Sequence, residues 1–187
     1  MKNVLLAISG PSGVGKGTIV KELLSSDDIV SSVSCTTRAP REGEVDGKDY
    51  FFLTREEFQK RIQEDGFLEY DEHFGNFYGT PKSFVVETLK KKSVILEIDV
   101  KGALNAKRIF PDTLLIMVVP PSVEELKNRL VGRGTESKEA IEERIRRVEY
   151  ELSFAESYDY VVVNQELNQA VEQIRGIIER AKLKGQQ

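Results

Sequence analysis

The sequence has 187 residues, of which 40% are hydrophobic and 31% are charged, and its formal net charge is −4. This size allows one sizeable core with a small insertion, and the negative charge argues against nucleic acid as a partner. A single cysteine, Cys35, excludes an intramolecular disulfide and predicts a cytoplasmic protein, and no apolar run is long enough to predict a membrane span.

Short apolar runs predict the strands of one sheet. Near-continuous apolar character is typical of strands that helices cover on both faces, and four runs have it: residues 4–8, 93–99, 113–119 and 160–163. Apolar residues at helical spacing separate these runs, in residues 16–24, 141–152 and 167–181. Strands that alternate with helices predict an α/β fold with a parallel sheet and right-handed crossovers.

Residues 34–80 interrupt this alternation. They contain turn signals such as "REGEVDGKD" and a capping-box spacing between Thr54 and Glu57. Ten of the fifteen Phe and Tyr residues lie between Tyr50 and Phe84. Because a small module needs bulky side chains to build its own core, we expect an inserted α+β module here.

The first motif is "GPSGVGKGT" at residues 10–18. A glycine, four further residues and then Gly15 and Lys16 match a phosphate-binding loop, with an apolar strand before it and a helix after it. Its backbone N–H groups, Lys16 and the helix N-terminus would hold phosphate, and the alternative is a glycine-rich turn. Gly17 stands where such loops usually carry a hydroxyl, so we expect magnesium to lack that ligand, whereas Thr18 can still bind a phosphate.

The second motif is "SVILEIDVKGA" at residues 93–103. It places Glu97 and Asp99 at the carboxyl end of a buried strand, beside the phosphate-binding loop. There Asp99 could hold magnesium directly or through water, or it could simply cap the following helix. A regulatory GTPase would also need an N-K-x-D loop, and the sequence contains none.

Arginines and hydroxyls in residues 34–50 predict a site for a second phosphate group. Arg38 and Arg41 lie near Ser34 and Tyr50 in a polar stretch, and arginine forks suit phosphate. The alternative is a solvated loop with incidental charges.

The segment "EYDEHFGNFYGTP" contains Glu69, Tyr78 and Thr80. A buried carboxylate can accept from both N1–H and the 2-amino group of guanine, and a hydroxyl can donate to O6. Adenine would leave these groups unpaired, at a cost of roughly 1–3 kcal/mol for each group. The alternative for Glu69 is a surface carboxylate.

The segment "RLVGRGTESKEAIEERIRRVEYEL" is rich in arginine. Arg133 lies between two glycines, so it could swing onto a transferring phosphate, and Arg144 could join it. For Arg146 and Arg147 we expect a charged helix face supported by i,i+4 ion pairs.

Together these motifs resemble the guanylate kinases, which are small P-loop nucleoside monophosphate kinases. The resemblance covers nearly the whole chain, through "GPSGVGKGT", "SCTTRAPREGEVDGKDYFF", "GNFYGTP", "LEIDVKGA", "RLVGRGTES" and "YDYVVVN". The second segment is the most specific, because it belongs to the GMP-binding insertion. The resemblance implies phosphorylation of GMP to GDP by ATP with Mg²⁺.

The resemblance also implies roles for the matching residues. ATP would be held by the loop, with Asn164 beside the adenine, that is by Gly10, Pro11, Ser12, Gly13, Val14, Gly15, Lys16, Gly17, Thr18 and Asn164. GMP would be held by Ser34, Arg38, Arg41, Tyr50, Glu69, Tyr78, Thr80 and Asp99. The catalytic residues would be Lys16, Arg38, Asp99, Arg133 and Arg144, with Asp99 near the metal. Lys101, where relatives often carry Gln, is given no role.

Three parts are expected along the chain: a nucleotide-binding core in residues 1–33, 81–129 and 148–187, a GMP-binding insertion at 34–80, and a lid at 130–147. One alternative is a kinase of the same fold that acts on another phosphorylated acceptor. The other is an inactive module of this fold that only binds partners. The sequence predicts no oligomeric state.

Overall fold

The computed structural model describes residues 2–73, 75–126 and 138–184. Within these residues the larger sheet has five strands, in the order β2-β7-β1-β8-β9. The strands are β1 (Leu5–Ser9), β2 (Ile29–Ser31), β7 (Ser93–Glu97), β8 (Leu114–Val119) and β9 (Tyr160–Val163). All neighbouring pairs run parallel, which confirms the predicted α/β fold with a parallel sheet.

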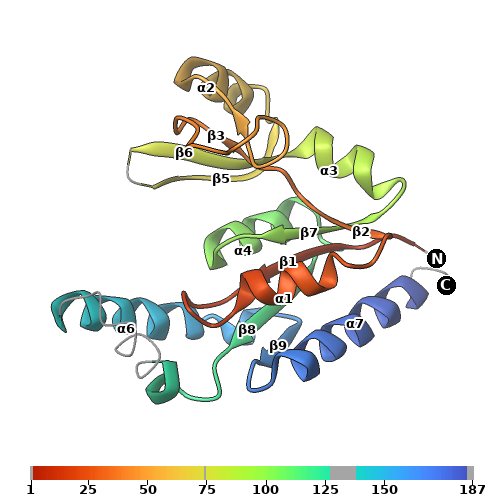
Figure 1. Cartoon of the computed structure of the whole chain (residues 1–187). Coiled ribbons are helices and arrows are strands. Elements are labelled where there is room, and N and C mark those ends of the chain that lie inside the picture. The colour runs from red at the N-terminus through yellow and green to blue at the C-terminus, as the bar shows by residue number, and fades with distance from the viewer. Residues whose placement is uncertain (1, 74, 127–137, 185–187) are drawn as a thin grey trace.

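Helices cover both faces of this sheet (Figure 1). One face packs against α1 (Lys16–Leu23) and α7 (Leu167–Lys184), and the other packs against α3 (Lys82–Leu89) and α4 (Val100–Ile109). Alternate residues of β1 enter the two cores, because Leu6 and Ile8 belong to the first cluster and Leu5 and Ala7 to the second. This two-sided burial explains the continuous apolar run in the sequence.

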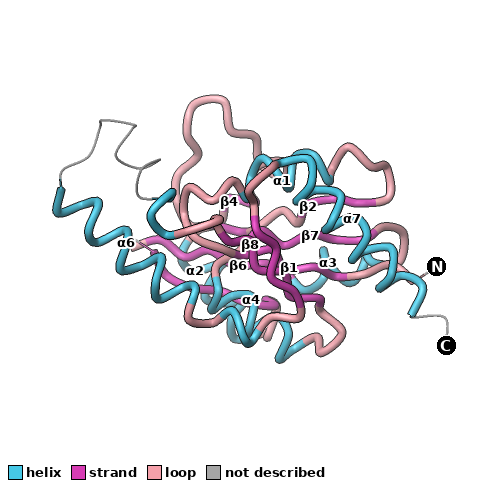
Figure 2. The backbone as a smooth tube through the Cα atoms, turned by 90° about the horizontal axis from the view of Figure 1, so that it is seen from below, coloured by secondary structure: helices cyan, strands magenta, loops and turns pink. Residues whose placement is uncertain are grey.

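Further helical elements follow β8 in the chain. Helix α6 (Lys138–Leu152) and the short 3₁₀ helix η1 (Ala155–Ser157) precede β9. Figure 2 shows α6 at the end of the molecule opposite the two termini. Among the helices that the structure describes, none combines the length and the apolar character needed to cross a membrane.

A second sheet lies above the first in Figure 1, with strand order β4-β3-β6-β5. Its elements are β3 (Cys35–Thr36), β4 (Phe51–Phe52), α2 (Arg55–Gln63), β5 (Phe67–His73) and β6 (Asn76–Pro81). The predicted capping box is confirmed, since Thr54 and Glu57 exchange both side-chain-to-backbone bonds at the start of α2. Phe58 is fully buried and stacks on Phe67 at 4.3 Å, so aromatic side chains do form a separate core in this module.

Candidate active site

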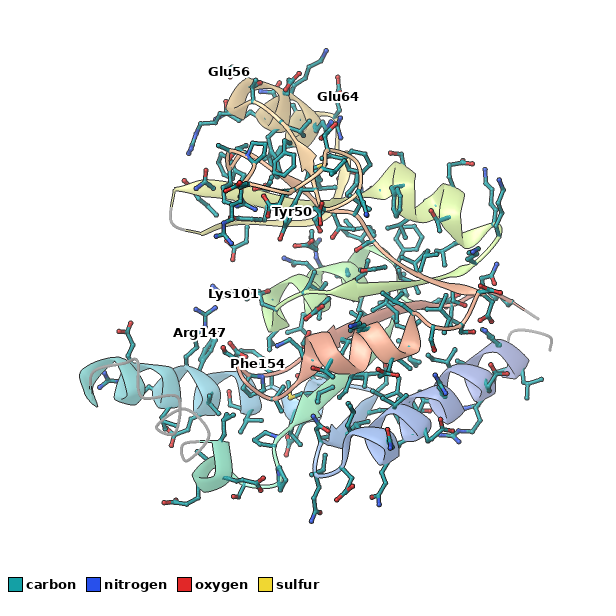
Figure 3. All side chains as sticks on the ribbon, in the orientation of Figure 1. Tyr50, Glu56, Glu64, Lys101, Arg147 and Phe154 are labelled. Atoms are coloured by element: carbon teal, nitrogen blue, oxygen red, sulfur yellow. The ribbon has the colours of Figure 1, made fainter. Side chains whose placement is uncertain are left out.

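A cavity of about 1060 Å³ lies at the carboxyl edge of the larger sheet. Four parts of the chain line it: the loop at residues 10–18, Tyr50 of the small sheet's module, the segment 97–99 after β7, and Arg147, Val148 and Glu151 of α6. In Figure 3, Tyr50 lies on the side of its module that faces the core, and Arg147 rises from α6 toward that module. Segments far apart in the sequence therefore meet in one space.

The loop after β1 has the backbone that its glycines allow. Gly10, Gly13 and Gly15 have φ angles of 146°, 86° and 95°, which other residues rarely adopt. A Cβ at Gly10 would also lie only 2.1 Å from the carbonyl oxygen of Val118. Helix α1 begins directly after Gly15, so its N-terminal N–H groups and dipole favour an anion in the loop.

Lys16 places its positive charge over this loop. Its Nζ donates to the carbonyl oxygens of Gly10 and Pro11. Burial lowers the pKa of Lys16, whereas the carboxylates of Glu151 and Glu97 act to raise it. The ammonium group thus bonds two carbonyl oxygens of the loop and lies within electrostatic range of two carboxylates that line the cavity.

Asn164, which was predicted to lie beside the adenine of ATP, contacts the backbone of the phosphate-binding loop. It is buried, and its Nδ2 donates to the carbonyl oxygen of Val14 at 2.7 Å. A Cβ at Gly15 would lie 2.6 Å from that same Nδ2. The side chain therefore fixes the loop backbone, and its contact with adenine stays a prediction.

Asp99 is both a helix cap and a cavity residue. Its Oδ1 accepts a hydrogen bond of 2.8 Å from the backbone N–H of Gly102 at the start of α4, so the alternative role as a cap is confirmed. It lines the cavity together with Glu97. Two carboxylates thus border the same space as the phosphate-binding loop, and oxygen ligands of this kind suit Mg²⁺.

Arg38 lies in a group of charged and aromatic side chains beside the cavity. Its Nη2 bonds Glu44 Oε1 at 2.8 Å, and its guanidinium carbon lies 5.5 Å from the centre of the Tyr50 ring. Tyr50 in turn lies edge to face with Tyr78, with 6.2 Å between ring centres. Of the described residues predicted to bind the acceptor phosphate, Tyr50 alone lines the cavity itself. Arg41 is exposed.

Glu44 is a residue of this group that the sequence motifs did not predict. Its Oε2 accepts from the backbone N–H of Arg41 at 2.7 Å while Oε1 binds Arg38. Both bonds lower the pKa of Glu44, and the bond from Arg38 has the larger effect. The signal that could have found it is an acid three residues after one arginine and six after another. Ser34 borders this group through its backbone, since its carbonyl accepts from Phe51 N–H at 2.9 Å.

Glu69 and Thr80 face each other across β5 and β6. Thr80 is fully buried, and its Oγ1 donates to Glu69 Oε1 at 2.6 Å. Burial raises the pKa of Glu69, and the nearby charge of Asp99 raises it further. Glu69 is therefore a held, largely desolvated carboxylate rather than one on the open surface.

The predicted lid residues are described only in part. Arg133 lies outside the described residues, and so does the side chain of Arg144, although its backbone belongs to α6. The i,i+4 pair predicted for this helix is confirmed by Arg147 Nε and Glu151 Oε1, which are 3.2 Å apart. Both residues line the cavity, which the sequence pattern did not predict. Arg147 follows Arg144 by three residues, and this spacing on one helical face could have found it.

Comparisons with known proteins show the family of this chain. A sequence model of the family described as guanylate kinase matches residues 2–181. Guanylate kinase of Clostridium tetani is 50% identical over 182 residues, covering 97% of this chain and 88% of the relative, and that of Bacillus anthracis is 50% identical over 95% and 88%. The crystal structure of guanylate kinase from Anaplasma phagocytophilum is 36% identical, with a TM-score of 0.75 over 97% of this chain and 87% of that one. The chain therefore belongs to the guanylate kinase family.

Proposed function

We propose that the protein is a guanylate kinase that transfers the γ-phosphate of ATP to GMP, giving ADP and GDP. One observation carries this proposal: a single cavity joins the phosphate-binding loop to Tyr50 of the module that also holds the Glu69–Thr80 pair. Family membership supports it, since this chain matches 88% of the length of each of the two guanylate kinases named above. Donor and acceptor phosphates would meet where these parts come together.

The donor ATP binds through its phosphates to the loop at residues 10–18. The helix N-terminus and Lys16 supply positive charge there, and the glycine backbone allows close approach of the N–H groups. Asn164 maintains this backbone through Val14. The loop thus acts as the site for the group that is transferred.

The acceptor GMP binds in the module at residues 34–80. Its phosphate contacts Ser34, Arg38, Arg41, Tyr50 and Tyr78. Its guanine donates N1–H and the 2-amino group to ionised Glu69. In the structure the Thr80 hydroxyl already donates to Glu69, so Thr80 orients the carboxylate, and donation to guanine O6 requires that bond to break.

Catalysis rests on position and charge. A phosphate monoester is largely dianionic at pH 7, because its second pKa is about 6, so its oxygen needs no general base to attack. Lys16 and Arg38, with Arg133 and Arg144 by family resemblance, offset the negative charge where two polyanions meet. Closure of the lid at 130–147 over the core and the 34–80 module excludes water. The second sheet, whose strands lie between Cys35 and Pro81, supports the boundaries proposed for the insertion at 34–80.

Magnesium fits the carboxylates of the cavity. Asp99 would hold it directly or through water, and the ion would neutralise phosphate charge during transfer. Gly17 offers no hydroxyl, and a Cβ there would lie 3.7 Å from Glu97 Oε1, an ordinary contact. Gly17→Ser therefore fits and should lower the Mg²⁺ concentration for half-maximal activity several-fold. An unchanged magnesium titration would contradict the proposal that the loop lacks this ligand.

A coupled assay of ADP release with GMP, AMP, CMP and UMP tests the function. We expect strong preference for GMP, and absent or equal turnover with GMP would refute it. Glu69→Ala tests the alternative acceptor, because a kinase for a non-guanine acceptor would lose little activity. Calorimetry with ATP tests the inactive module, which would not bind it.

The nucleotide substrates and the single cysteine support a cytoplasmic location.

A further inference from the structure

We propose that Arg147 is a further phosphate-binding residue of the donor site and that Glu151 is the positioning residue that orients it. The inference rests on the proposed function, because it requires ATP phosphates in the loop cavity. Both residues lie on α6 and both line that cavity together with Lys16. In Figure 3 the Arg147 side chain leaves α6 on the side of the gap between the core and the module at 34–80.

The two side chains differ in exposure in the way that an anchor and a ligand-binding group should. The side chain of Glu151 is 14% exposed, whereas that of Arg147 is 63% exposed. The bond between them joins Arg147 Nε to Glu151 Oε1 at 3.2 Å. Since this bond is made by Nε, it does not occupy the two Nη groups, which are the pair that suits phosphate oxygens.

The electrostatics place Arg147 near the phosphate-binding loop. Burial is the main cause that lowers the pKa of Lys16, and the Arg147 charge lowers it as well, whereas Glu151 acts in the opposite direction. The positive charges of Arg147 and Lys16 therefore repel each other. Two cations held close together cost energy by themselves, and a polyanion between them would remove this repulsion.

Glu151 has a specific consequence for anion binding. A carboxylate beside a phosphate site repels the phosphate unless a cation neutralises it. The Glu151 side chain is largely buried beside the cavity, and its hydrogen bond to Arg147 is the main contact that offsets its desolvation. Glu151 thus orients the guanidinium of Arg147 at the cavity, and the guanidinium in turn offsets the negative charge that Glu151 would direct at a phosphate.

Arg147→Ala tests the binding role, with ATP binding measured by calorimetry without GMP and with KM values for both substrates. We expect Kd and KM for ATP to rise about tenfold, as for the loss of a charge-assisted hydrogen bond, while KM for GMP stays within about twofold. Arg146→Ala is the matched control, because Arg146 is the adjacent, exposed residue of the same helix and does not line the cavity. It should change neither constant by more than about twofold.

Glu151→Gln tests the positioning role in two backgrounds. In the wild-type background we expect weaker ATP binding by about threefold, because Arg147 loses its charged anchor. In the Arg147→Ala background the same change should strengthen ATP binding, because only the repulsive carboxylate is removed. Additive effects in this double-mutant cycle would overturn the positioning role.

The remaining outcomes separate this inference from the proposed function. If the wild-type protein binds ATP and phosphorylates GMP but Arg147→Ala behaves like Arg146→Ala, the inference is wrong and the proposed function stands. If the wild-type protein does not bind ATP, the proposed function is wrong and the inference falls with it. Thermal unfolding of each variant shows whether a weakened variant is still folded.

Discussion

The Thr80 hydroxyl donates a hydrogen bond of 2.6 Å to Glu69, and this bond orients the carboxylate that the proposed guanine site depends on. The two residues are directly paired between β5 and β6. Thr80 is fully buried and Glu69 is largely desolvated, so the bond lies in a region of low dielectric. Its loss would leave Oε1 of the partly buried Glu69 without this partner.

Thr80→Val tests this orientation, because valine keeps the shape and removes the hydroxyl. We expect KM for GMP to rise about tenfold, as Glu69 loses one hydrogen bond to a charged group, worth roughly 1.5–3 kcal/mol. KM for ATP should not change. Thr80→Ser keeps the donor and should remain close to the wild type in KM for GMP. Equal effects of Val and Ser would show that packing, not the hydrogen bond, is what matters at this position.

Glu69→Gln should change stability in a pH-dependent way. Burial, opposed by the Thr80 bond and reinforced by the charges of Asp99 and Asp71, raises the pKa of Glu69 in the folded protein. Between the ordinary and the raised pKa the folded state therefore binds more protons than the unfolded state, and stability falls as pH rises through this window. Glutamine cannot ionise but can still accept from Thr80.

The melting temperatures of Glu69→Gln and the wild-type protein should thus diverge as pH rises through the raised pKa of Glu69, with the variant the more stable. The difference should disappear at pH values below the ordinary pKa of a glutamate, where both side chains are neutral. Activity with GMP should fall in the variant at all pH values. A constant difference in melting temperature across this range would contradict ionisation of Glu69 as the cause.

Gly102 holds open the space in which Glu69 lies. A Cβ at Gly102 would be 3.1 Å from Glu69 Oε2 and 3.3 Å from Asp99 Oδ1. Gly102→Ala should therefore displace the carboxylate by a few tenths of an ångström and raise KM for GMP about tenfold, with KM for ATP within about twofold.

The control for this variant is Gly176→Ala in α7. A Cβ there would be 3.3 Å from Arg180 Nη1, the end of a flexible side chain that can move aside. Alanine favours helix formation over glycine by about 1 kcal/mol in the interior of a helix, where Gly176 lies. It does not disfavour helix formation in the first turn of α4, so propensity does not explain a loss of GMP binding in Gly102→Ala. Steady-state kinetics of the two variants decide the matter, and a normal KM for GMP in Gly102→Ala would refute the crowding argument.

The sequence predicted the parts of the site that are local in the chain. The phosphate-binding loop needs one strand, one spacing of glycines and one lysine, all within residues 4–18, and continuous apolar runs identified strands β1, β7, β8 and β9. Strand β2 was missed because it has three residues, of which only Ile29 is buried. A run that is so short and so weakly apolar cannot be recognised in the sequence as a buried strand.

Contacts between distant segments could not be predicted in the same way. Gly102 matters because α4 packs against β5, and Arg147 matters because the exposed face of α6 borders the cavity. In both cases the sequence contains an ordinary pattern, a glycine near a helix start or an i,i+4 ion pair, and only the fold brings it to the site. Asn164 shows the same point, since its partner Val14 lies 150 residues away.

Asn164→Ala distinguishes support of the loop from contact with adenine. Removal of the amide leaves the buried carbonyl of Val14 without this donor, at an expected cost of about 1–3 kcal/mol in the free energy of unfolding. Since a displaced loop backbone binds any triphosphate less well, Kd should rise equally for ATP and GTP. The control is Asn168→Ala, at an exposed position of α7, which should change neither stability nor nucleotide binding. Unfolding curves and calorimetry with both nucleotides check this. A loss of ATP over GTP preference with unchanged stability would instead assign Asn164 to the adenine, because a base contact discriminates between purines and a backbone support does not.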